Sequence, residues 1–156
     1  MLLLLLRHAD ADTPAARDEQ RRLSEKGVAQ AKRVGRFCRG HDIIPERILT
    51  SPVVRARETA EFFAGELQGA SVEVAPFLAC GMHPDTGSKE LKAFLSTGSL
   101  MIIGHEPDFG RLAAHLLGTD NERIHVRKAS LILLDVTSFV PGSARLEFSI
   151  PCRFMT

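Results

Sequence analysis

The first hydrophobic feature of the chain is an uninterrupted apolar run from Leu2 to Leu6. The run is too short for a helix of ordinary length, and it lacks the alternation of a strand that has one face in solvent. A continuous run of this kind is typical of a strand buried on both faces of a parallel sheet. The pattern therefore predicts a central strand at residues 2–6.

Helical periodicity follows in three longer segments. The first comes after Ser24, which can cap a helix, and stops at Gly40, which can end one. The second starts at Ser51 and Pro52, a cap residue followed by proline at the first helical position, and the third stops at Gly118. Each should bury one face. The apolar stripes are Val28, Ala31, Val34 and Cys38; Ala56, Ala60, Phe63, Ala64 and Leu67; and Phe109, Leu112, Ala113, Leu116 and Leu117.

Short apolar stretches between these segments predict the remaining strands. The stretches cover residues 47–50, 72–74, 100–103, 130–136 and 145–150. The last two flank the turn-forming pair Pro141-Gly142, so we expect an antiparallel hairpin there. Residues 76–86 should form a loop, and a short helix marked by Leu91, Phe94 and Leu95 should follow. Alternating strands and helices predict a three-layer α/β/α sandwich with a mostly parallel central sheet, in one domain that spans residues 1–156.

Composition and charge narrow the class of protein. The 156 residues are 44% hydrophobic and 25% charged, as one globular core requires. A formal net charge of +1 argues against wholesale nucleic-acid binding, so any basic character must be local. Cys38, Cys80 and Cys152 lie far apart and form no CxxC pair, which argues against a disulfide framework or a zinc site. The apolar start lacks a basic segment before it, and no stretch approaches a membrane span, so we expect a soluble, cytoplasmic protein.

The residues that follow the predicted strands are the candidates for chemistry. In an open parallel sheet, ligands bind beyond the carboxyl ends of the strands. There the chain places Arg7 and His8 after the first strand, Ser51 and Arg55 after the second, and His105 after residues 100–103. Guanidinium groups beside helix N-termini favour a phosphate ion or phosphoryl group as ligand.

A histidine in such a pocket is a candidate nucleophile. Neighbouring arginines disfavour the protonated imidazole, so His8 should stay neutral and keep a lone pair that can attack phosphorus. Arg7, Arg55 and His105 can donate to the equatorial oxygens of the transition state, where kinases use metal ions. We therefore expect neither a metal nor a cofactor.

Four motifs that contain these residues resemble the histidine phosphatase superfamily, which includes the phosphoglycerate mutases and the SixA-type phosphohistidine phosphatases. The motifs are L-R-H at residues 6–8, R-x-L-S-E-K-G-x-x-Q-A at 21–31, S-P-x-x-R-A-x-x-T-A at 51–60 and G-H-E-P at 104–107. The resemblance spans nearly the whole chain. It implies that His8 carries the phosphoryl group covalently, that Arg7, Arg55 and His105 complete the pocket, and that Arg21 contributes to substrate binding.

Two positions depart from the pattern of the family. Many members have glycine after the R-H pair, where this chain has Ala9, a change we expect to be tolerated. Larger relatives place a glutamate general acid after the third strand, but residues 76–81 contain no carboxylate. Because a phosphohistidine nitrogen can leave already protonated, the missing acid favours an N–P substrate on a phosphorylated protein. Asp10, Asp12 and Asp85 are possible replacement donors.

Two other functions remain as alternatives. A general small-molecule phosphomonoesterase or mutase would share the pocket, and the missing glutamate argues against it. A phosphate-binding module without activity would not need all of Arg7, His8, Arg55 and His105. The sequence therefore favours a phosphohistidine phosphatase with no membrane partner.

Overall fold

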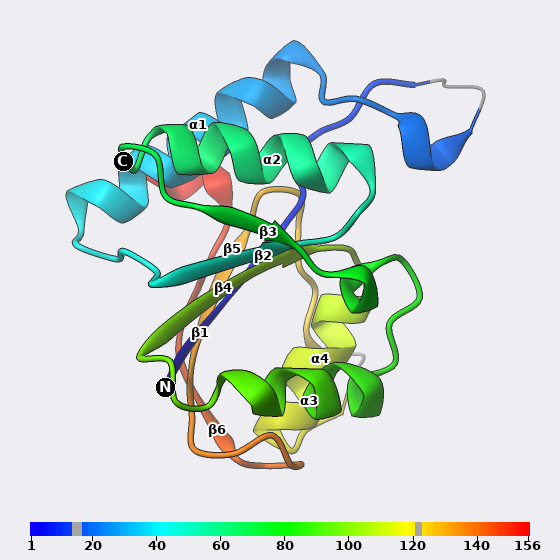
Figure 1. Cartoon of the computed structure of the whole chain (residues 1–156), viewed down its shortest axis with the longest axis vertical. Helices are drawn as coiled ribbons and strands as arrows, with labels where there is room; N and C mark the ends of the chain where they lie inside the picture. The colour runs from blue at the N-terminus through cyan, green and yellow to red at the C-terminus, as the bar shows by residue number, and fades with distance from the viewer. Residues whose placement is uncertain (14–16, 121–122) are drawn as a thin grey trace.

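A six-stranded sheet with helices on both faces forms the fold (Figure 1). The computed structural model describes residues 1–13, 17–120 and 123–156. The strand order is β3-β2-β4-β1-β5-β6, which places the leucine-rich strand in the interior of the sheet. Helices α1 and α2 cover one face, and α3 and α4 cover the other. This arrangement confirms the predicted three-layer α/β/α fold.

The bounds of the elements agree closely with the hydrophobic pattern. The strands are β1 (Leu2–Arg7), β2 (Arg47–Thr50), β3 (Val72–Val74), β4 (Ser99–Gly104), β5 (Leu131–Val136) and β6 (Ala144–Ile150). The helices are α1 (Glu25–Gly40), α2 (Val54–Gly65), α3 (Pro84–Leu91) and α4 (Asp108–Leu117). Short 3-10 turns are η1 (Asp18–Gln20), η2 (Pro76–Leu78), η3 (Lys92–Phe94) and η5 (Cys152–Phe154).

The register of the sheet brings the ends of three strands together. β1 pairs with β4 in parallel, so that Arg7 lies opposite Gly104. β2 pairs with β4 on its other side, with Thr50 opposite Ile103. β5 and β6 run antiparallel, as the hairpin prediction required, and β5 also pairs with β1. The residues that follow β1, β2 and β4 therefore meet at one edge.

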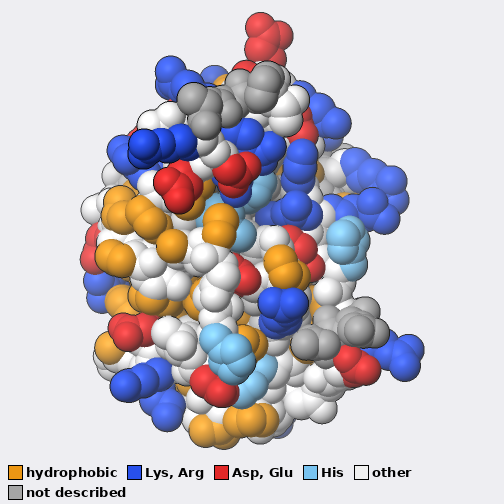
Figure 2. Space-filling model, turned by 90° about the vertical axis from the view of Figure 1, so that its right-hand side faces the viewer, with side chains coloured by type: hydrophobic (Ala, Val, Ile, Leu, Met, Phe, Trp, Pro, Cys, Tyr) orange, Lys and Arg blue, Asp and Glu red, His pale blue; other side chains and the backbone are white. Residues whose placement is uncertain are grey.

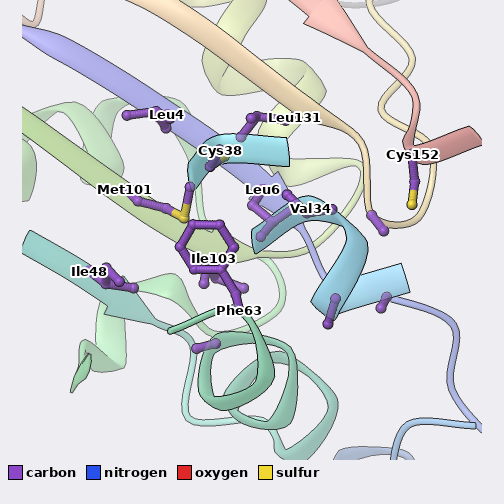
Figure 3. Packing of buried hydrophobic residues seen from close by; sticks show 14 of the residues in the cluster. Leu4, Leu6, Val34, Cys38, Ile48, Phe63, Met101, Ile103, Leu131 and Cys152 are labelled. Carbon is purple, nitrogen blue, oxygen red and sulfur yellow. The ribbon is translucent and has the colours of Figure 1, made fainter. Parts of the chain in front are cut away.

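Two hydrophobic clusters explain why β1 has no polar position from Leu3 to Leu6. Leu4 and Leu6 pack in the cluster beneath α1 and α2, and Leu3 and Leu5 pack in the cluster beneath α3 and α4. Figure 3 shows the first cluster, in which Phe63 of α2 lies against the sheet. Because strand side chains alternate between faces, a strand covered on both sides must be apolar throughout.

The capping interactions confirm some predicted helix ends and correct others. The Ser24 side chain accepts a hydrogen bond from the Gly27 amide at the start of α1, and Gly118 ends α4 with φ of 69°. The prediction that α2 starts at Ser51-Pro52 was wrong, since α2 begins at Val54. The helix expected around Leu91 begins earlier, at Pro84.

Local hydrogen bonds account for both corrections. Ser51 Oγ accepts from the Val53 amide, which holds the backbone in a turn before α2 begins. The His83 ring accepts from the Asp85 amide and caps α3, with Pro84 at the first helical position. No helix in the described parts of the chain has the length and apolar character needed to cross a bilayer.

Candidate active site

The side chains predicted from the strand ends gather at the carboxyl edge of the sheet. His8 follows β1, His105 follows β4, and Arg55 lies in the first turn of α2. All three are buried, with 4%, 3% and 6% of their surface exposed, respectively. Figure 2 shows the molecule from the side on the right in Figure 1, where histidine atoms are recessed between basic and acidic side chains.

The His8 ring is held in one orientation and one tautomer. Its Nδ1 lies 2.8 Å from the carbonyl oxygen of Ala9. Because a carbonyl can only accept, Nδ1 carries the proton and Nε2 keeps a lone pair. The loop is fixed in turn by Thr59, whose Oγ1 accepts from the Ala9 amide at 3.0 Å. Arg55 Nε donates to His8 Nε2 at 3.3 Å, so Nε2 faces the other predicted site residues.

Burial keeps the His8 imidazole neutral. The pKa of His8 is lowered to about 3, mainly by burial and to a smaller extent by the nearby His105, Arg55 and Arg7. The hydrogen bond to the Ala9 carbonyl acts in the opposite direction. The neutral imidazole predicted from the sequence therefore depends mainly on burial, and the neighbouring arginines, which we expected to be its cause, contribute less.

His105 presents an unpaired ring nitrogen to the same space. Its Nε2 lies 2.7 Å from Ser51 Oγ. The Ser51 hydroxyl can accept from the Val53 amide at 3.2 Å and at the same time donate its proton to His105 Nε2, an arrangement in which the ring proton lies on Nδ1. His105 Nδ1 is buried and has no partner within the described residues. Burial, with Arg55 and Arg7, lowers the pKa of His105 to about 4.

Arg7 is held by a hydrogen bond to the segment that precedes β5. Its Nη1 donates to the carbonyl oxygen of Val126 at 2.8 Å, while its buried Nε has no partner in the described part of the chain. Burial lowers the pKa of Arg7, and the carboxylate of Glu106 opposes that effect. Glu106 itself accepts a hydrogen bond from the Gly110 amide, which fixes the position of the carboxylate that acts on Arg7.

An aspartate that was not predicted from the sequence pairs with the Arg55 guanidinium. Asp18, in η1, accepts from Arg55 Nη1 through its carbonyl oxygen at 3.0 Å, and its carboxylate lies 3.1 Å from Arg55 Nη2. Arg55 Nη2 also lies 3.6 Å from Cys80 Sγ. The one sequence signal for Asp18 is its position three residues before Arg21, and no periodicity distinguishes it.

Arg21 reaches the site only through this aspartate. Its Nε lies 3.2 Å from Asp18 Oδ1, so Arg21 and Arg55 share one carboxylate. The structure gives Arg21 no contact with His8 or His105 among the described interactions. A cavity of about 460 Å³ lies beside this ion pair. Its lining residues come from η1 and the residue before it, from the turn between β2 and α2, and from the loop after β3: Arg17, Asp18, Glu19, Pro52, Val53, Ala79 and Cys80.

The three aspartates suggested as replacement acids lie elsewhere. Asp10 is bound by Lys128 at 2.8 Å, and that hydrogen bond is the main cause of its lowered pKa. Asp85 lies exposed at the start of α3 beside His83, and Asp12 is exposed in the loop after β1. Within residues 1–13, 17–120 and 123–156, no three His, Cys, Asp or Glu side chains are grouped as metal ligands would be.

Comparisons with known proteins agree with this arrangement. Residues 3–79 match the family model of the histidine phosphatase superfamily (branch 1). The phosphohistidine phosphatase SixA of Escherichia coli (strain K12) is 35% identical over 122 residues, which cover 74% of each chain. The structure of the protein histidine phosphatase SixA complexed with tungstate superimposes with a TM-score of 0.91 at 25% identity, over 100% of both chains. The α-ribazole phosphatase of Shigella flexneri shares the fold, with a TM-score of 0.79 at 16% identity over 97% of each chain.

Proposed function

Because the chain belongs to the histidine phosphatase superfamily, we propose that it is a phosphohistidine phosphatase that acts through a covalent phospho-His8 intermediate. We further propose that residues 1–156 form one catalytic domain. The separate free thiols of Cys38, Cys80 and Cys152 are compatible with a cytoplasmic location, which we also propose.

One observation carries the proposal. A neutral imidazole donates its Nδ1 proton to a carbonyl, and its Nε2 lone pair accepts from Arg55 Nε beside the Arg7 guanidinium and an unpaired His105 nitrogen. Arg55 Nε transfers its hydrogen bond from this lone pair to a phosphoryl oxygen before Nε2 attacks. This combination of a nucleophile with fixed donors suits phosphoryl transfer, in which charge develops on the three equatorial oxygens. A module that only binds phosphate would need the donors but not the nucleophile, because oxyanion binding requires no histidine held in one tautomer.

In the first step, His8 Nε2 forms a bond to phosphorus as the bond between phosphorus and the substrate nitrogen breaks. The substrate imidazole carries a proton on its other ring nitrogen, so it keeps the electron pair of the broken bond and leaves as a neutral imidazole. Arg7, Arg55 and the His105 Nδ1 proton donate to the phosphoryl oxygens, and Asp18 gives up its place on Arg55 to them. In the second step, water attacks phospho-His8, its proton passes to the released phosphate, and Nε2 regains its lone pair.

The surroundings of the site favour a nitrogen leaving group. An alkoxide must be protonated as it leaves, whereas an imidazole leaves as a weaker base. The loop after β3 brings Cys80 rather than a carboxylate to Arg55. The Asp18 carboxylate is paired with both Arg55 and Arg21. SixA relatives, whose names specify phosphohistidine, support the same substrate class.

A trapping experiment tests the covalent step. We expect ³²P from a labelled phosphohistidine peptide to appear on the wild-type protein after a rapid alkaline quench, and to be lost in acid, as a phosphoramidate bond requires. His8→Ala should give no label, and the exposed His41→Ala should serve as the matched control that keeps it. Acid-stable label, or label that persists in His8→Ala, would contradict the proposal.

A substrate series tests the leaving group. The kcat/KM of a phosphohistidine peptide and of aryl phosphates should greatly exceed that of sugar phosphates, because no general acid assists an alkoxide. The small-molecule phosphomonoesterase alternative predicts sugar phosphates turned over as fast as phosphohistidine. In that case the substrate assignment would be wrong, while the role of His8 would stand on the trapping result.

A further inference from the structure

A second cavity lies beside the phosphate site and shares Arg7 with it. It has a volume of about 410 Å³ and is open to solvent. Its basic lining residues are Arg7, Lys26, Arg127, Lys128 and Arg153. We call this cavity, defined by these residues, the basic groove. Because Arg7 is the last residue of β1 and directly precedes His8, the groove borders the proposed active site at Arg7.

The positive charge of the chain is concentrated in the basic groove. Asp10 is the carboxylate among the residues that line it, and Asp10 already accepts from Lys128 and Ser24, both at 2.8 Å. The whole chain has a formal net charge of only +1, so the remainder is net acidic. Such a local excess of cations beside a cavity attracts anions and raises their rate of association.

The groove is built from separate elements rather than from one flexible segment. Lys26 lies in the first turn of α1, Arg127 and Lys128 lie before β5, and Arg153 lies in η5. Backbone bonds hold the strip before β5 in place, since the Ala129 amide donates to the Arg7 carbonyl and the Ser130 amide donates to the Arg127 carbonyl. The backbone positions that carry these cations are therefore fixed around one cavity.

The rim of the groove suits a protein better than a nucleic acid. The Arg153 guanidinium lies 4.7 Å from the centre of the Phe154 ring, and Phe154 is 59% exposed. Pro151 lines the groove as well. Apolar side chains beside cations match an acidic peptide segment that carries both carboxylates and apolar groups, whereas a nucleic-acid chain would require a longer basic track than one such cavity provides.

We propose that the basic groove binds acidic side chains that flank the phosphohistidine of the protein substrate. The proposal rests on the proposed function, because the acidic segment would reach the groove while its phosphohistidine occupies the pocket beside Arg7. The charges at the rim of the groove then select among phosphoproteins, mainly by raising the rate of association with acidic partners. That rate should fall as the salt concentration rises.

Three synthetic phosphohistidine peptides of equal length test the groove. One has glutamates on the N-terminal side of phosphohistidine, one has them on the C-terminal side, and one has glutamines throughout. We expect kcat/KM for one acidic peptide to exceed that of the neutral peptide by about tenfold, as for electrostatically steered association. High salt should remove most of that preference.

Matched charge reversals locate the effect. The variant Lys26→Glu/Arg127→Glu/Arg153→Glu should lose the preference for the acidic peptide and hydrolyse the neutral one at close to the wild-type rate. The control Lys89→Glu/Lys92→Glu/Arg145→Glu makes the same change in net charge on exposed residues of α3, η3 and β6, and it should keep the preference. The milder Arg153→Gln replaces the triple variant if the latter does not fold, and should show a partial loss.

The outcomes separate the two proposals. Hydrolysis of all three peptides at equal rates, or a preference that the groove variants retain, would overturn the groove proposal and leave the phosphatase intact. No hydrolysis of any phosphohistidine peptide would instead overturn the proposed function. A single-stranded oligonucleotide that binds in a groove-dependent manner, with no preference among the peptides, would assign the groove to nucleic acid and refute the acidic-protein partner.

Discussion

Acidification should destabilise this protein steeply because two histidines of the proposed site are buried in their neutral forms. Burial lowers the pKa of His8 to about 3 and that of His105 to about 4. In the unfolded chain both rings titrate near an ordinary value of about 6.5. Between these limits the unfolded state binds more protons than the folded state. The stabilising contribution is therefore complete above about pH 6.5 and is lost as the pH falls through this range.

The size of the effect follows from the two shifts. Each pH unit over which one group is protonated only in the unfolded state costs about 1.4 kcal/mol. From pH 7 to pH 4.5, each histidine loses about 2.5 kcal/mol of its contribution, or about 5 kcal/mol for the pair. A domain of ordinary stability has about 5–15 kcal/mol in total, so the loss is large enough to measure directly.

Urea unfolding followed by circular dichroism at several pH values between 4.5 and 7 measures this loss. Acetate and MES buffers are preferable to phosphate, since an oxyanion that binds the native pocket would stabilise it. The double variant His8→Gln/His105→Gln lacks both titrating groups, so its free energy of unfolding should fall by about 5 kcal/mol less than that of the wild type. The exposed His41→Gln should follow the wild type.

If the free energy of unfolding falls equally with pH in the wild type and in the double variant, this reasoning is refuted. It would mean that His8 and His105 are protonated as easily in the folded protein as in the unfolded chain. A neutral nucleophile at low pH would then be untenable. The contribution of Asp10, whose pKa is also lowered, is present in both proteins and cancels in the difference.

Three further substitutions test individual contacts. Arg55→Lys should lower kcat by roughly 100-fold, a loss of about 3 kcal/mol, because one ammonium cannot reproduce the donor fork of a guanidinium. A kcat close to that of the wild type in steady-state kinetics would show that Arg55 does not stabilise the transition state. Asp18→Asn should lower the inhibition constant of tungstate, because the oxyanion no longer competes with a carboxylate for Arg55. The expected decrease is about 1.5- to 5-fold, which corresponds to the energy of an exposed ion pair. A large fall in kcat instead would identify Asp18 as a proton donor. Gly27→Ala should destabilise the fold by about 1–3 kcal/mol in urea unfolding, because a Cβ there would lie 1.9 Å from the Asp10 carbonyl oxygen; unchanged stability would show that the loop after β1 yields freely.

The sequence by itself determined the order of the elements and the edge at which the site forms. From Leu3 to Leu6, strand β1 is covered on both faces and must be apolar at every position. This requirement leaves a continuous apolar run that can be recognised in the sequence alone. The side chains that follow a strand lie at its carboxyl end whatever the rest of the fold does. His8 and His105 could therefore be assigned to one crevice before the register of β1 and β4 was known.

Only the tertiary structure decided how those side chains are held and which others join them. Asp18 contacts Arg55 across a separation of 37 residues, and the hydroxyl of Ser51 binds His105 across 54. The basic groove likewise draws on α1, the segment before β5 and η5. Hydrogen bonds and ion pairs of this kind form only when segments that are distant in the sequence are positioned to within a few tenths of an ångström. Periodicity records which face of an element is buried, but it carries no information about such distances, because they are set by the packing of the whole sheet and its helices.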